Sequence, residues 1–290
     1  MHKFLRAIGF SDITKKDLEM ILDEVITRPE IMKITKDSEG NEFAELSGSF
    51  AANAGITVRG TYQEDDSFHM DYYYPYVFGT SITTNEQIDV EKHAEKESYA
   101  GVCDEVNLGV TLIFYIQNVA DYLAETNRHL SKIHYGAMLA GLSTEGKILC
   151  PVVERKKNDV PAIQKNDRHN QLIAQAREGD EDAIESLTLE DMDTYALLSQ
   201  RVMKEDIFSI VKSTFMPFGI ESYQYTVLGE IIDCVTMENK LTHEKLYGMK
   251  LLCNNIQFDV CINEKDLLGE PAIGRRFRGN VWMQGNLCLE

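Results

Sequence analysis

Positive charge is scarce in this chain. Its 290 residues include 29 Lys and Arg against 47 Asp and Glu, which gives a formal net charge of −18. Proteins that bind DNA or RNA gain most of their non-specific affinity by neutralising phosphates, so this balance argues against a nucleic-acid partner. The same negative charge opposes binding to anionic membrane surfaces and favours solubility.

Long apolar runs, an export signal and paired cysteines are missing as well. No stretch is long and apolar enough to span a bilayer, and the opening MHKFLRAIGFSD lacks the apolar segment and cleavage site of a signal peptide. The six cysteines are scattered, with no C-x-x-C pair and no zinc-type spacing. Most of them lie in apolar, strand-like runs such as KILCPVV. We therefore expect a soluble, cytoplasmic protein with reduced cysteines, no metal and no membrane partner.

Sequence motifs for catalysis are absent too. The chain has no phosphate-binding glycine loop, no H-E-x-x-H and no G-x-S-x-G. No catalytic residue and no cofactor are predicted. The lack of a catalytic constellation favours an interaction or ligand-binding protein without catalytic activity, whose partner is an unknown protein or small ligand. The alternative is a hydrolase or transferase with a site between two domains.

Residues 1–152 have the pattern of an α+β domain. Thr14 and Asp17 resemble a capping box, and apolar residues repeat at helical spacing from Leu18 until Arg28-Pro29 ends the helix. Short strand-like segments with turn signals follow, among them IMKIT, NEFAELSG, GITVRGTYQ and SFHMDYYYPYVFG. HYGAMLAGLS and GKILCPVV predict two further strands. These patterns indicate a mostly antiparallel sheet with helices.

The remainder divides into a connector and a barrel. Residues 153–217 begin with clustered charge and continue at helical spacing, which predicts a linker and a helical segment. From Ser222 the period changes to two, and the first strand, YQYTVLGEIIDCVT, carries a central glycine suited to a sharp bend. Residues 218–290 are therefore expected to form a small closed β-barrel of the OB or SH3-like kind.

The stretch GEPAIGRRFRGNVWMQG supplies the first candidate binding face. Alternation in a strand places Arg276, Arg278 and Trp282 on the face opposite Phe277. Two guanidiniums beside an indole suit stacking and bidentate contact with carboxylate or phosphate, so we expect an acidic partner or ligand. Two other interpretations remain open. The indole could be buried while the arginines pair with the chain's own carboxylates, or this face could dock on the N-terminal domain.

The second candidate lies in FHMDYYYPYVFG. Tyr72, Tyr73 and Tyr74 could stack on a ligand or anchor a protein partner, with Tyr73 on the opposite face from the other two. The competing interpretation makes them amphipathic core residues with hydroxyls at the rim.

The chain also resembles a known family. The stretch GEPAIGRRFRGNVWMQG, together with FMPFGIESYQYTVLGEI, FDVCINEKDLLGEP, YYYPYVFG and GVTLIFYIQN, is similar to an uncharacterised family of clostridial-type bacterial proteins of about this length. The resemblance covers the whole chain. It implies a cytoplasmic bacterial protein and assigns no functional residue.

Overall fold

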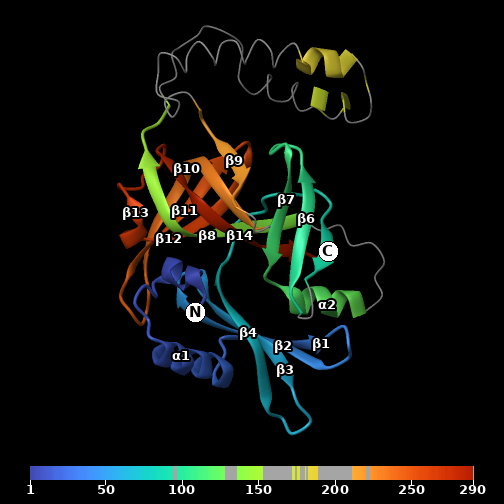
Figure 1. Cartoon of the computed structure of the whole chain (residues 1–290), viewed down its shortest axis with the longest axis vertical. Helices are drawn as coiled ribbons and strands as arrows, with labels where there is room; N and C mark the ends of the chain where they lie inside the picture. Colours follow the sequence, from blue (N-terminus) through green and yellow to red (C-terminus); the bar gives the residue numbers. More distant parts are fainter. Residues whose placement is uncertain are drawn as a thin grey trace.

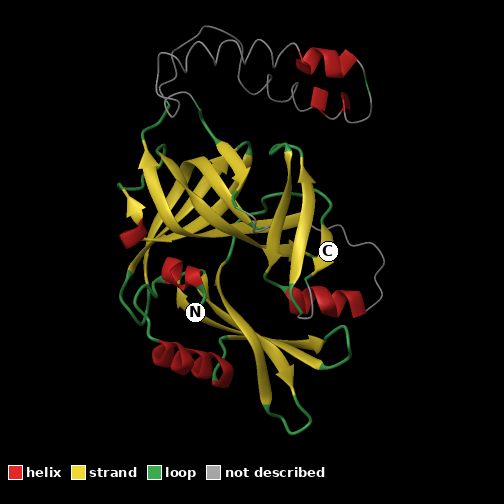
Figure 2. Ribbon diagram, viewed as in Figure 1, coloured by secondary structure: helices red, strands yellow, loops and turns green. Residues whose placement is uncertain are grey.

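Two β-sheets dominate the molecule, with short helices at their margins (Figures 1 and 2). The computed structural model describes residues 1–93, 97–127, 136–152, 172–173, 175–176, 180, 182–188, 211–219 and 223–289. Most of the predicted helical connector lies outside these residues, although residues 182–188 are helical. In the described part of the chain, no helix is long and apolar enough to cross a bilayer. The predicted α+β class is confirmed.

The smaller sheet is an antiparallel meander of four strands, β1 (Ile31–Lys36), β2 (Glu42–Ala51), β3 (Ala54–Tyr62) and β4 (Phe68–Val77). The helix α1 (Lys15–Thr27) covers one face, where Val25 packs against Gly48. Thr14 and Asp17 cap this helix reciprocally, as predicted, with Asp in place of the usual Glu. The helix α2 (Val119–Asn127) lies against the opposite face, over β1 and β2.

In the part of the chain that the structure describes, the larger sheet has ten strands and closes partly on itself. Its strands are β5 (Asp89–Lys92), β6 (Tyr99–Glu105), β7 (Val110–Ile116), β8 (Gly136–Leu149), β9 (Thr214–Pro217), β10 (Gln224–Glu238), β11 (Lys245–Cys253), β12 (Ile256–Asn263), β13 (Leu267–Leu268) and β14 (Arg276–Cys288). The barrel follows the order β8, β12, β11, β10 and β14, and the pairing of β14 with β8 closes it. The strands β7, β6 and β5 continue the sheet outward from β14.

The predicted closed barrel is therefore present, and one of its five strands comes from earlier in the chain. Residues 136–149 form the single strand β8, where two separate strands were expected. This strand pairs with β14 along nearly its whole length and in parallel with β12. Residues 218–290 therefore close into a barrel only together with β8, which precedes them in the chain. The strand β14 also pairs in parallel with β7, another earlier strand.

Two apolar clusters hold the structure together. One fills the barrel and extends under β6, β7 and α2; it includes the fully buried Phe277, Val281 and Met283 of β14. The other lies between α1, the four-stranded sheet and the outer surface of the barrel, and it includes Trp282. Alternate residues of β14 therefore enter different clusters, which follows from the two-residue period of a strand.

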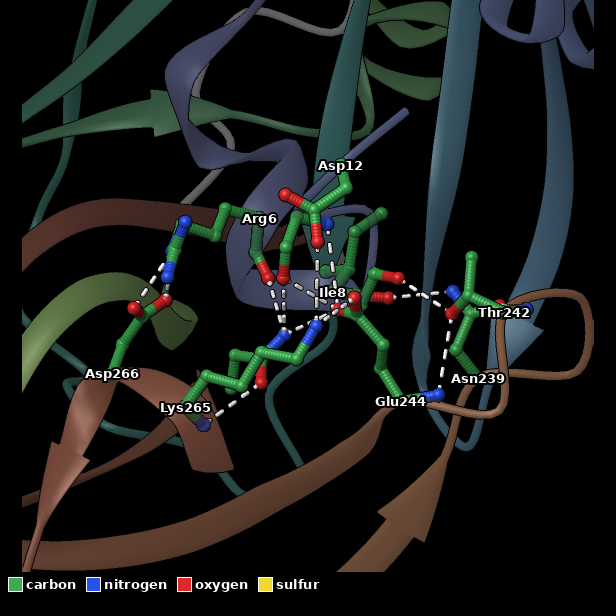
Figure 3. A network of polar contacts seen from close by, with 11 residues as sticks. Arg6, Ile8, Asp12, Asn239, Thr242, Glu244, Lys265 and Asp266 are labelled. Carbon is green, nitrogen blue, oxygen red and sulfur yellow. Dashed lines mark hydrogen bonds and ion pairs between the residues drawn. The ribbon is translucent and has the colours of Figure 1, made fainter. Parts of the chain in front are cut away.

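The first residues of the chain form a wedge between the two sheets. The 3-10 helix η1 (Lys3–Ile8) contacts β4, β8 and β12, and its apolar side chains belong to the second cluster. Polar contacts fix the wedge to the loops of the barrel (Figure 3). Arg6 pairs with Asp266 at 2.6 Å, and Asn239 donates to the carbonyl of Ile8 at 2.7 Å. Lys265 lies between the carboxylates of Glu244 and Asp12.

Candidate functional site

The outward face of β14 carries the residues of the first predicted binding face. Arg276 lies at one end of this face and is only 5% exposed. Its Nε donates to the carbonyl of Cys150 at 2.9 Å, and its Nη1 donates to the carbonyl of Val211 at 2.6 Å. Burial lowers the pKa of this guanidinium below its ordinary value. Arg276 therefore binds the backbone at Cys150, just before the predicted connector, and at Val211, near the end of that connector.

Trp282, at the other end of the face, is also covered. The indole is 7% exposed and packs on the rings of Phe4 and His2, with centroids 5.2 Å and 4.8 Å away. The next outward residue, Gln284, is fully buried and donates to the carbonyl of Pro75 at 2.8 Å. The wedge and β4 thus cover this end of β14, so Arg276, Arg278 and Trp282 do not form one exposed surface.

The middle of the outward face remains accessible. The half-buried Arg278 lines a groove of about 390 Å³ on the barrel surface. The groove is lined by Glu145, Gly146, Lys147, Phe218, Thr226, Leu268, Arg278, Gly279 and Asn280. Arg278 lies directly opposite Lys147 in the ladder between β14 and β8. Large apolar side chains border the two cations, and Leu268 is 74% exposed.

A pair of glycines sets the path of the strands beneath this groove. Gly279 lies opposite Gly146, and the ring of Phe277 occupies the space that both missing side chains would need. A Cβ at Gly279 would lie 2.5 Å from Phe277, and one at Gly146 would lie 2.4 Å from the same ring. The glycine in RRFRGNV and its partner Gly146 are therefore required by the barrel core. Next to them, Asn280 accepts from the hydroxyl of Thr226 and donates to Glu145, which fixes one wall of the groove.

The three tyrosines of the second predicted site separate. Tyr73 accepts a hydrogen bond from the backbone N–H of His2 at 3.3 Å, on the side of the wedge. Tyr72 and Tyr74 point to the opposite face, where both hydroxyls accept hydrogen bonds from Arg59. Tyr72 also donates to the carbonyl of Glu97 at 2.7 Å. The structure thus places Tyr72 and Tyr74 together and Tyr73 apart from them.

Arg59, which is fully buried, is the centre of a polar cluster that the sequence analysis missed. Its Nε donates to Glu45 at 2.7 Å, and a third tyrosine, Tyr115 of β7, accepts from its Nη1 at 2.8 Å. The backbone carbonyls of Ile116 and Gln117 accept from its Nη2. The guanidinium also lies over three tyrosine rings, and the centroid of Tyr74 is 4.9 Å away. Burial raises the pKa of Tyr115 well above its ordinary value, which keeps this hydroxyl protonated.

This cluster joins the two sheets. Arg59 belongs to β3 of the smaller sheet, whereas Tyr115 and the two carbonyls belong to the end of β7 and the residue after it. An arginine in the middle of GITVRGTYQ was the available signal, because a charge in a buried strand needs a partner. The sequence does not show which residues satisfy it.

Comparison with known proteins gives one match. No curated protein and no solved structure matches the chain. A family model described as "Domain of unknown function, E. rectale Gene description (DUF3881)" matches residues 5–285. Since the match spans nearly the whole chain, as the resemblance predicted, the protein belongs to this family.

Proposed function

We propose that the protein is an interaction protein that binds an acidic peptide segment in the groove around Arg278. The observation that carries the proposal is a local reversal of charge. Among the described residues that line the groove, Arg278 and Lys147 are cations and Glu145 alone carries a carboxylate, in a chain of net charge −18. A guanidinium is suited to bidentate contact with a carboxylate.

Apolar anchors support the same kind of partner. Phe218 is 42% exposed and Leu268 is 74% exposed, and both line the groove beside the cations. Burial of large apolar side chains at the centre of an interface supplies much of the binding energy, while charges at its rim raise specificity and association rate. The segment that fits this groove therefore carries carboxylates and at least one large apolar side chain.

The three residues first predicted for this face then have different roles. Arg278 contacts the partner, whereas Arg276 and Trp282 hold the barrel to the rest of the chain. Arg276→Ala removes two hydrogen bonds from a buried charged group, so we expect it to destabilise the protein by roughly 1.5–3 kcal/mol. Arg278→Ala, at a half-buried position, is expected to cost less stability than Arg276→Ala.

A fluorescent peptide of alternating Glu and Leu tests the proposal by anisotropy, with a Lys and Leu peptide as its charge-reversed control. We expect saturable binding of the acidic peptide that weakens as salt is added. Arg278→Glu and Lys147→Glu should each weaken binding about tenfold or more, whereas the same charge reversal at the exposed Lys16 should not. Equal binding by wild type and the groove variants, or a preference for the basic peptide, would contradict the proposal.

The alternative function, a hydrolase or transferase with a site between two domains, stays a prediction, as do solubility and the cytoplasmic location.

A further inference from the structure

A second hollow lies between the two sheets and is separate from the groove around Arg278. It has a volume of about 250 Å³. The four-stranded sheet supplies its floor through Glu45, Ser47 and Thr57. Gln117, Asn118 and Asp121, at the start of α2, form one wall, and the ends of β8 and β14 form another. We call this hollow the inter-sheet cleft.

The floor of the inter-sheet cleft is polar although it is buried. Strand register places Ser47 opposite Thr57 and Glu45 opposite Arg59. The hydroxyls of Ser47 and Thr57 lie 2.8 Å apart, and both residues are buried. A contact that served only to pack two sheets would favour apolar side chains here, because burying polar groups costs free energy.

The amide of Gln117 supplies an independent sign of a ligand. This residue is 5% exposed, and its Nε2 donates to the carbonyl of Val77 at 2.9 Å and to Gln284 Oε1 at 2.8 Å. These two bonds fix the orientation of the amide. Its Oε1 is buried and has no hydrogen-bond partner among the described residues. An acceptor held in this way gains from any donor that reaches it.

Charges at the cleft cancel in pairs. Glu45 accepts from Arg59 at 2.7 Å and from the backbone N–H of Ala120 at 2.8 Å, so this carboxylate already occupies the start of α2. Asp121 pairs with Lys33 at 2.6 Å at the rim. A ligand with a net charge would have to displace one of these ion pairs, whereas a neutral ligand would not.

We infer that the inter-sheet cleft binds a small neutral polyhydroxy compound of about monosaccharide size. Hydroxyl groups both donate and accept, which suits the amide of the half-buried Asn286. The acceptor of Gln117 is enclosed, so a ligand hydroxyl reaches it once neighbouring side chains of the cleft move. Phe78 and Met138 add an apolar wall for the C–H groups of such a compound. The volume lies below the range of drug-sized sites, which restricts the ligand to a smaller molecule.

Titration calorimetry on the full chain tests this inference. The probes are neutral monosaccharides and polyols, each compared with its phosphorylated or carboxylated analogue. Two variants change the cleft: Asn286→Leu removes a hydrogen-bonding amide, and Met138→Trp fills the space. The exposed Asn85 provides a matched control, Asn85→Leu. Thermal unfolding checks that each variant is folded.

We expect saturable binding of at least one neutral compound, and tighter binding than its charged analogue. Asn286→Leu should weaken it about tenfold and Met138→Trp should abolish it. Asn85→Leu and Arg278→Glu should leave the affinity for the neutral compound unchanged. The result with Arg278→Glu distinguishes binding in the inter-sheet cleft from binding in the proposed peptide groove. Failure of every neutral probe to bind wild type, tighter binding of the charged analogues, or binding unaffected by both cleft variants would overturn the inference.

Discussion

Replacing Arg59 by methionine should be one of the most destabilising single changes in the four-stranded sheet. Methionine keeps much of the length of the side chain but removes every donor. Six acceptors lose a hydrogen bond from the guanidinium: Glu45 Oε1, the hydroxyls of Tyr72, Tyr74 and Tyr115, and the carbonyls of Ile116 and Gln117. The carbonyl of Gln117 keeps its bond from the Tyr74 hydroxyl, and among the described residues Glu45 keeps its bond from the backbone N–H of Ala120.

The magnitude follows from what is left behind. Removing one partner of a buried ion pair typically costs about 3–5 kcal/mol, because the other charge stays buried without compensation. Arg59 is fully buried and Glu45 nearly so, which places this pair in that class. At about 2–4 °C per kcal/mol for a chain of this size, the midpoint of thermal unfolding should fall by roughly 10 °C.

Urea unfolding of a double-mutant cycle measures the effect. Arg59→Met, Glu45→Met and the double variant are compared with Arg28→Met, which changes an exposed arginine and should cost less than about 0.5 kcal/mol. The double variant should be more stable than Arg59→Met alone, since it removes the uncompensated carboxylate. A loss below about 1 kcal/mol for Arg59→Met would refute the assignment of Arg59 as the polar link between the sheets.

Three further predictions concern thiols, glycine and alkaline pH. A thiol reagent should modify the exposed Cys150 first and the buried Cys261 slowly, because burial raises the pKa of Cys261 to about 12. The denatured, unreduced protein should titrate as six free thiols, and fewer would indicate a disulfide. Gly279→Ala should cost roughly 1–3 kcal/mol by collision with the ring of Phe277 and the carbonyl of Glu145. Phe277→Leu should relieve only the first collision, and equal stability of wild type and Gly279→Ala would contradict both. Burial raises the pKa of Tyr225 to about 12, so the unfolded state loses this proton first, and this residue alone should lower the free energy of unfolding by about 1.4 kcal/mol for each pH unit between about 10 and 12. Tyr225→Phe should reduce the slope of the whole protein by that amount, and a slope equal to that of wild type would count against it.

Local patterns predicted the elements of this fold well. The helix α1 begins at a capping box read from Thr14 and Asp17, and the strand expected in YQYTVLGEIIDCVT is β10. Each rests on interactions within a few residues of sequence. The two halves of β8 show the limit. A polar and glycine-containing stretch, STEG, lies between them and is typical of a turn, but Gly146 continues the strand because it faces Gly279 under the ring of Phe277.

The candidate binding face shows a different limit. Alternation along β14 was predicted correctly, since Phe277 faces the barrel core and Trp282 faces outward. Outward, however, does not mean exposed, because Phe4 and His2 cover the indole. These two residues lie at the opposite end of the sequence from Trp282, so their contact with the indole depends on tertiary packing that local patterns do not show. Arg59 was missed for the same reason, since its partner Tyr115 lies 56 positions away.

The wedge formed by η1 has a consequence for how the chain is made. The carbonyl of Arg6 accepts a hydrogen bond from Asn263, which is 257 positions later in the sequence, and Phe4 stacks on Trp282. During synthesis these early residues cannot form their native contacts until the strands that they contact have been translated. Contacts of such long range close large loops and slow folding. The apolar side chains of the wedge are therefore exposed to solvent while the rest of the chain is translated. A chaperone that binds residues 2–12 on the ribosome should raise the yield of folded protein more than a chaperone that binds the completed barrel.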